Sequence, residues 1–431
     1  MTVPLFELPD PELPDDVLPD AELPVPGPRV IGRAESRGER FAPASETAHE
    51  VTFVHTADWQ LGMTRHYLGP EAAHAYTAAR LEAIERIGAL VAEVDAEFVV
   101  VAGDVFEDQR VSSRIIRRTL DALAAFGVPV YLLPGNHDPY DAAGVYRSRT
   151  FVQACPDNVT VLSGEGVHQV RDGVELVAAP WAHKHPGADL VGRQVARLSP
   201  GDGIRILVGH GGVDEMTPGN GTSLIGLGSL ETAVESGVVD YVALGDRHSV
   251  TSVGSTGRIW YPGAHEVTNF DHIEESPGHA LAVTLRRSGS TREIDVSPHR
   301  VGQWSFRTIS ADVGGVANIE ALRARLGEID DKPRTVLQLG LVGSISVADS
   351  AVLDDLLDEC ADRFAAVTRW GRADDLAVLA DDADLDELAV GGYVRDTAEE
   401  LFAHSRSDDS DSARSARDAL ALLRRLAGNS R

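Results

Sequence analysis

The sequence predicts a mixed α/β fold: a four-layer sandwich of two β-sheets flanked by helices, then a small α/β domain and C-terminal helices. Two observations predict it. Between residues 50 and 300, apolar runs of strand length alternate with helix-like stretches and then become strand-rich. Five of these runs end in small polar clusters, which is typical of buried strands whose carboxyl ends meet at one crevice.

The elements follow in order along the main domain. Helices are expected at 70–94 and 111–126, between the first three strands. Strands that lead into polar clusters are expected at 51–54, 98–102, 128–134, 204–208 and 238–244. Further strands are expected at 159–162, 174–178, 258–261, 280–285 and 293–296. The run at 98–101 is apolar throughout, as a strand buried on both faces should be.

Four segments are expected along the chain. Residues 1–48 are rich in Pro, Asp and Glu, which predicts a disordered acidic arm, and residues 49–300 form the main domain. At 301–390 the pattern restarts as a small α/β domain, with strands at 305–309 and 335–341 and helices at 319–326 and 349–363. Residues 391–431 hold two amphipathic helices, and the apolar face of the last one docks either on this chain or in a groove of a partner.

Composition limits the classes of function. With 39 basic and 67 acidic residues, the net charge is −28, so nucleic acid would need a locally basic face or bound metal ions. Cys155 and Cys360 lie far apart in the sequence and are expected to be reduced, as in a cytoplasmic protein. We see no signal peptide and no apolar stretch near the roughly 20 residues that span a bilayer, so no membrane association is expected.

The five clusters are the candidate functional residues. Alone, each carboxylate could cap a turn, and each histidine could be structural. Together, at successive strand ends, they predict a site for two divalent cations, because oxygen and imidazole donors converge there. In chain order the clusters are His55-Thr-Ala-Asp58-Trp-Gln60, Gly103-Asp104-Val-Phe-Glu107, Gly135-Asn136-His137-Asp138, Gly209-His210 and Gly245-Asp246-Arg247-His248.

With these motifs, residues 50–300 resemble the calcineurin-like metallophosphoesterases and, within them, the SbcD-type DNA repair nucleases. The small domain is similar to that family's capping domain in position and pattern. The resemblance implies two metals bridged by Asp104, and His137 as the catalytic histidine. It places Asp58, residue 60, Asp104 and His248 on the first metal, and Asp104, Asn136, His210 and residue 246 on the second.

Two positions depart from the family pattern. Gln60 and Asp246 stand where the family has histidine. Both carry an oxygen donor, which favours Mn²⁺ first, or Mg²⁺, over softer metals. An alternative for Gln60 is that it orients a bound water instead of binding metal. His265 stands near the family's Ser-Pro position and is a candidate phosphate contact, unless it is structural.

Candidate DNA contacts follow the second cluster. Arg110, Arg114, Arg117 and Arg118 lie on or just before a predicted helix, although such a run is also typical of a solvated helix face. We interpret the chain as a metal-dependent DNA phosphodiesterase, an SbcD-like exonuclease or endonuclease in DNA repair. By resemblance it is of the 3′–5′ exonuclease type, pairs with an SbcC-like coiled-coil ATPase and forms a homodimer.

Two alternatives stay open. The pocket could act on a nucleotide, a phosphoprotein or another small phosphoester. Alternatively, Gln60 and Asp246 could have weakened the chemistry and left a DNA-end-binding subunit. Six of the expected site residues match the family pattern, which favours an active enzyme: Asp58, Asp104, Asn136, His137, His210 and His248.

Overall fold

The computed structural model describes residues 48–217, 223–270, 276–379 and 393–405, together with scattered positions between 412 and 423. The acidic arm predicted at 1–48 lies outside the described residues, apart from its last position. The limits predicted for the domains stay predictions, and the one at 390 also falls outside the described part of the chain.

The first large sheet has six strands in the order β12-β11-β1-β2-β3-β4. The strands β1, β2, β3 and β4 are parallel, whereas β11 runs antiparallel to both β1 and β12. Their bounds are His49–Thr56 (β1), Phe98–Val101 (β2), Val130–Leu132 (β3), Val159–Val161 (β4), His279–Ser288 (β11) and Thr291–Arg300 (β12).

The second large sheet also has six strands, in the order β5-β6-β7-β8-β10-β9. Its central strands β6, β7, β8 and β10 are parallel. The bounds are Gly166–Arg171 (β5), Val174–Ala178 (β6), Ile204–His210 (β7), Tyr241–Gly245 (β8), Val250–Val253 (β9) and Ile259–Pro262 (β10). The sequence pattern missed β5, an antiparallel strand at the end of the sheet whose residues are exposed or half-buried.

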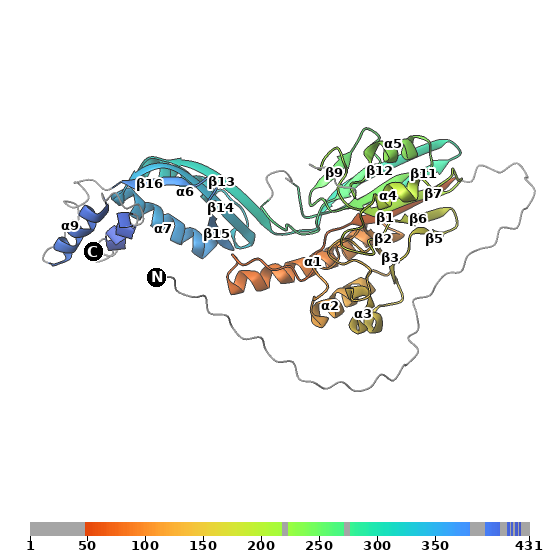
Figure 1. Cartoon of the computed structure of the whole chain (residues 1–431), viewed down its shortest axis with the longest axis horizontal. Coiled ribbons are helices and arrows are strands. Elements are labelled where there is room, and N and C mark those ends of the chain that lie inside the picture. The colour runs from red at the N-terminus through yellow and green to blue at the C-terminus, as the bar shows by residue number, and fades with distance from the viewer. Residues whose placement is uncertain are drawn as a thin grey trace, which may run out of the picture. The chain divides into compact units, whose positions relative to one another are not determined.

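Helices cover the outer face of each sheet (Figure 1). The first sheet packs on α1 (Pro70–Glu93), α2 (Ser113–Ala124) and α3 (Arg149–Ala154). The second packs on α4 (Leu190–Val195) and α5 (Leu227–Glu235). Between the sheets lies a third core that contains Phe53, Phe98, Ile206 and Tyr241. The predicted four-layer arrangement is therefore confirmed.

Strand direction explains why the polar clusters meet. In the first sheet, Thr56 at the end of β1 pairs with Val101 at the end of β2. In the second, His210 at the end of β7 pairs with Gly245 at the end of β8. A parallel bridge between Ala57 and Ala264 joins the two sheets at this edge. The polar clusters that follow these strands are thus brought to one end of the sandwich.

His55 on β1 is buried but belongs to the core. Its Nδ1 lies 3.0 Å from the Tyr241 hydroxyl, and burial lowers its pKa to about 3. An unfolded histidine titrates near 6.5, so below that pH the unfolded state binds a proton that the folded state rejects, and stability falls as pH falls.

The free energy of unfolding of the wild-type protein should fall by about 1.4 kcal/mol between about pH 7.5 and about pH 5.5 because of His55, and we expect His55→Gln to remove this fall. The free energy of unfolding in urea, measured in EDTA at both pH values, checks this. If the wild-type protein and the variant lost equal stability over the interval, burial of a neutral His55 would be contradicted.

The smaller domain has its own sheet and core. Its strands are β13 (Ser305–Val313), β14 (Thr335–Ser346), β15 (Ala366–Arg369) and β16 (Asp375–Leu379), with β13, β15 and β16 all parallel to β14. Helices α6 (Val316–Gly327) and α7 (Val347–Arg363) pack on it. The sequence pattern predicted β13, β14 and both helices but not β15 or β16.

The apolar face of α9 (Tyr393–Ser405) packs on this chain. Ala398 and Phe402 form a cluster with Val347 at the start of α7 and with Leu420. Leu420 belongs to the last predicted helix, so the described part of that helix packs on this chain, the first of its two expected docking sites. No helix among the described residues combines the length and apolar character that crossing a membrane requires.

Candidate metal centre

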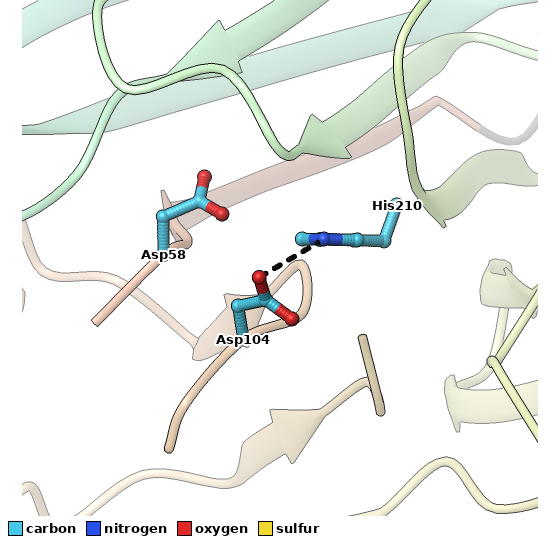
Figure 2. Close-up of side chains that lie close together, drawn as sticks. All are labelled: Asp58, Asp104 and His210. Atoms are coloured by element: carbon cyan, nitrogen blue, oxygen red, sulfur yellow. Dashed lines mark ion pairs between the residues drawn. The ribbon is translucent and has the colours of Figure 1, made fainter. Parts of the chain in front are cut away.

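Three buried side chains meet at the joined edge of the two sheets. Asp58 follows β1, Asp104 follows β2, and His210 ends β7. One potential ligand atom from each lies within 4.8 Å of the others. Figure 2 shows the three side chains around a common space, with an ion pair of 3.4 Å between Asp104 Oδ2 and His210 Nε2. This is the group of acidic and imidazole donors that a metal ion requires.

The surroundings of His210 call for a cation. Its Nδ1 donates a hydrogen bond to the Ala102 carbonyl at 2.8 Å, so in a neutral ring the Nε2 atom carries a lone pair. That Nε2 lies near oxygen atoms of Asn136 at 2.8 Å, Asp104 at 3.4 Å and Asp246 at 3.9 Å. Lone pairs that point at one another need a proton or a metal ion between them.

The pKa shifts of this group follow from the same geometry. Burial raises the pKa of Asp58 well above its usual value. Burial alone would lower the pKa of His210, but the nearby carboxylates, Asp104 first, hold it well above its usual value. Burial would also raise the pKa of Asp104, yet His210, assisted by His137, holds it below its usual value. A divalent cation could replace the proton that these side chains share.

A second set of donors lies beside Asp58. The amide of Gln60 lies opposite the imidazole of His248, with 3.5 Å between their Nε2 atoms. The Nδ1 atom of His248 is hydrogen-bonded to Thr268 Oγ1 at 2.7 Å, which orients the ring. The Gln60 Oε1 atom is buried and has no hydrogen-bond partner among the described residues. An oxygen in that state fits a metal ligand.

Asp246 contacts two members of the first group, Asp58 and His210. Its backbone N–H donates to the two carboxylate oxygens of Asp58 at 3.1 and 3.0 Å, and its own carboxylate faces His210. Hydrogen bonds and ion pairs thus link Asp58, Asp104, Asn136, His210 and Asp246, and the other two residues expected to bind metal, Gln60 and His248, pair with each other. Their role as ligands stays a prediction, but oxygen-rich donors of this kind fit two divalent cations.

His137 lies at the mouth of the group. Its backbone N–H donates to Asp104 Oδ1 at 2.9 Å, and its Nδ1 donates to the Glu107 carbonyl at 2.7 Å. The side chain is 34% exposed, and its Nε2 lies 4.0 Å from Asp104 Oδ2. The ring is thus fixed through one nitrogen, while the other lies on the side of the Asp104 carboxylate.

Backbone strain is concentrated at the expected metal site. Six non-glycine residues in the described part of the chain have positive φ angles, and four of them belong to the expected site. These are Asp58 (55°), Gln60 (41°), Asp104 (54°) and Asp246 (104°). Each such conformation costs on the order of 1–3 kcal/mol and persists where the surroundings enforce it, as they do at functional sites.

Gly135 leaves room for the Asp104 carboxylate. A Cβ atom at position 135 would lie 2.2 Å from Asp104 Oδ1 and 2.6 Å from its backbone nitrogen. We expect Gly135→Ala to weaken Mn²⁺ binding by roughly tenfold to a hundredfold, the usual effect of disturbing the support of a ligand. Calorimetric titration checks this, with Gly69→Ala as the matched control, because nothing lies within 4 Å of a Cβ atom there. Equal affinities in the two variants would contradict the close approach.

For His265 the structure favours the structural alternative over the phosphate contact. Its side chain is fully buried, lies against Trp59, and its Nε2 atom is 2.7 Å from the Arg80 carbonyl. It therefore cannot contact a phosphate group in solvent. By contrast, Arg114, Arg117 and Arg118 are exposed on α2, and Arg110 is exposed in the loop before it. No contact links these arginines to the metal group, so their role stays a prediction.

Sequence reasoning missed the residues that hold the site loops. Arg80 on α1 is fully buried and donates to the carbonyls of Trp59 and Val267, the neighbours of Gln60 and Thr268. Asp138, which the sequence placed in the third cluster without this role, is also buried and accepts hydrogen bonds from Gly135 N, Phe106 N and the Tyr146 hydroxyl. An arginine on a helix gives no signal of such a role, because charged residues on helices are typical of a solvated face.

The chain was compared with known proteins. Residues 51–250 match the family of calcineurin-like phosphoesterases. The DNA double-strand break repair protein Mre11 of Haloferax volcanii is 26% identical over 377 residues, which cover 83% of this chain and 76% of that protein. The protein of the same name from Archaeoglobus fulgidus is 35% identical over 91 residues, 20% of this chain and 19% of that protein.

Among solved structures, a dimetal phosphatase from Danio rerio aligns with 57% of this chain and 98% of its own, at 11% identity and a TM-score of 0.35. A purple acid phosphatase from yellow lupin (Lupinus luteus) seeds covers 60% of this chain and 53% of its own, at 13% identity and a TM-score of 0.36. The match over residues 51–250 spans the strand ends that carry Asp58, Asp104 and His210. The chain thus contains a calcineurin-like phosphoesterase domain.

Proposed function

We propose that this protein is a metal-dependent phosphodiesterase that cleaves DNA and uses two divalent cations, with Mn²⁺ the best match to its donors and Mg²⁺ the second. The observation that carries the proposal is the position of His210 Nε2, which lies 2.8 Å from Asn136 Oδ1, 3.4 Å from Asp104 Oδ2 and 3.9 Å from Asp246 Oδ1. Such a set binds a hard or borderline cation, and oxygen donors in place of histidine at 60 and 246 shift the preference toward Mn²⁺.

The protein's own side chains would divide the chemistry. When bound, two divalent cations supply an activated water and neutralise charge on the phosphoryl oxygens. Asp104, in contact with His210 and His137, is the residue best placed to be shared by both ions. His137, held through Nδ1 by the Glu107 carbonyl, would direct Nε2 to the phosphate and give a proton to the leaving sugar oxygen.

DNA as the substrate is supported by the similarity to Mre11 along 83% of this chain, which extends beyond the phosphoesterase domain. The exposed arginines at 110, 114, 117 and 118 are the candidate backbone contacts on an otherwise acidic protein. A coiled-coil ATPase partner, a homodimer and 3′–5′ polarity are further parts of the proposal, and they rest on the resemblance alone.

Cleavage in Mn²⁺ of linear duplex DNA and of bis(p-nitrophenyl) phosphate tests the proposal, with His137→Gln as the variant and Arg363→Gln as the control. We expect both substrates to be cleaved and both activities to fall in His137→Gln. Cleavage of the small diester alone would replace DNA by a small phosphoester. DNA binding without cleavage of either substrate would assign the chain as a DNA-binding subunit and overturn the proposed activity.

A further inference from the structure

A pocket separate from the metal group lies between the phosphoesterase domain and the smaller domain. Its volume is about 550 Å³, within the usual range for a small-molecule site. The phosphoesterase side contributes Tyr67 and Phe270, and the smaller domain contributes Trp370, Arg369 and Arg372. Aromatic residues make up 6% of the chain but three of the nine residues that line this pocket. Aromatic rings beside arginine are the side chains on which nucleobases stack.

The aromatic wall is held in place by the core beneath it. The rings of Tyr67 and Phe270 are 5.9 Å apart, and both contact Phe306, at 6.2 and 5.2 Å. Phe306 belongs to a cluster with the buried Tyr76 and Trp304, so the wall does not have to be ordered when a ligand binds. Tyr67, Phe270 and Trp370 are nevertheless half-buried, and Asn269 and Gly371 at the rim are exposed. A preformed, accessible stacking surface lowers the cost of binding.

The charges at the rim favour an anion at one position. Arg369 is neutralised by Asp374, with its Nε 3.0 Å from both carboxylate oxygens. Arg372 is exposed and has no carboxylate partner among the described residues. On a protein with a net charge of −28, an arginine that forms no ion pair with the described residues and lies beside three aromatic rings is a local exception. A nucleotide could place its phosphate group beside Arg372 and its base against the aromatic rings.

The pocket is continuous with the loops of the metal group. Thr268, two residues before Phe270, is hydrogen-bonded to His248, and its carbonyl accepts a hydrogen bond from Arg65 Nε at 2.6 Å. Arg65 and Tyr67 lie on the segment that follows Gln60. A polynucleotide chain that occupies the pocket would therefore lie along the two loops that carry Gln60 and support His248.

We propose that this pocket binds one unpaired nucleotide of a DNA strand, with its base stacked between Trp370 and the aromatic wall of Tyr67 and Phe270 and its phosphate held by Arg372. The identity of the strand as DNA rests on the proposed function, while the pocket itself does not. The site would hold an unpaired end or a displaced strand, because a base inside a duplex cannot present its face to the rings.

Binding of a labelled oligothymidylate to the full-length protein in EDTA tests this without any cleavage. Trp370→Ala should weaken binding by about fivefold to a hundredfold, the effect of losing one stacked base, whereas Trp370→Phe should keep most of the affinity. Arg372→Gln should weaken binding and lower the slope of log affinity against log salt by about 0.7, the contribution of one phosphate contact to single-stranded DNA. Arg363→Gln, an exposed arginine outside the pocket, is the matched control and should change neither.

Hydrolysis of bis(p-nitrophenyl) phosphate in Mn²⁺ separates this proposal from the proposed activity. We expect Trp370→Ala to hydrolyse the small diester at the wild-type rate. The wild-type protein could fail to cleave the diester and still bind the oligonucleotide in a way that depends on Trp370. In that case the proposed activity would be contradicted and the proposed pocket would be supported. Wild-type affinity in both Trp370→Ala and Arg372→Gln would overturn the pocket. The pocket would also be contradicted if Trp370→Ala lost oligonucleotide affinity and small-diester hydrolysis by the same factor, because Trp370 would then support the fold and not a bound base.

Discussion

Asp104→Asn should reduce hydrolysis of phosphodiesters at least about a hundredfold, with little change in the fold. Disturbing the support of a metal ligand costs tenfold to a hundredfold, and Asp104 is itself the carboxylate that contacts His210 and His137. Asparagine keeps the shape and one oxygen but removes the negative charge that attracts the cations. Initial rates of cleavage in saturating Mn²⁺, together with calorimetric titration of Mn²⁺, measure the effect.

The matched control for this prediction is Asp141→Asn. Asp141 is also a carboxylate in a loop after a strand of the first sheet, but it accepts from Gln109 Nε2 and does not contact the metal group. It should keep wild-type rates and wild-type Mn²⁺ affinity. Wild-type activity in Asp104→Asn would mean that the two ions are not held around this residue.

Arg80→Met should lower the free energy of unfolding by about 3–5 kcal/mol. The Arg80 guanidinium is buried, and it donates to the Tyr76 hydroxyl at 3.0 Å, to the Val267 carbonyl at 3.2 Å and to the Trp59 carbonyl. Methionine fills a similar volume but leaves both carbonyls without their charged donor. Because these carbonyls belong to the loops of Gln60 and Thr268, Mn²⁺ affinity should fall as well.

Urea unfolding in EDTA measures the stability term without a contribution from bound metal. Arg118→Met, on the exposed side of α2, should stay within about 0.5 kcal/mol of the wild-type protein. A loss in Arg80→Met no larger than in Arg118→Met would contradict the view that Arg80 fastens the site loops to α1.

The edge of the fold that carries the site could be predicted from the sequence, because buried parallel strands leave a strong pattern. Runs such as Phe98–Val101 are apolar at every position, and the first polar residues after them mark the strand ends. Parallel direction then brings Asp104 and His210 together although they are far apart in the chain. The weaker strands β5 and β15 were missed because half-exposed strands lack a continuous apolar run.

The sequence could not predict which polar side chains are buried in the core. The position of His265 near the family's Ser-Pro motif suggested either a phosphate contact or a structural role, and the side chain points into the core beside Trp59. Arg80 lies on a helix that has other charged residues at exposed positions, and only the tertiary structure shows that it faces inward. Both depend on which face of the chain packs against a distant segment, and local periodicity does not contain that information.

The most direct test is the anomalous scattering of manganese in crystals of the full-length protein. Two peaks should flank Asp104, one between it and the pair Asp58 and His248, the other between it and the pair Asn136 and His210. Manganese bound elsewhere, with these five side chains left without an ion, would contradict a binuclear centre at the joined edge of the two sheets.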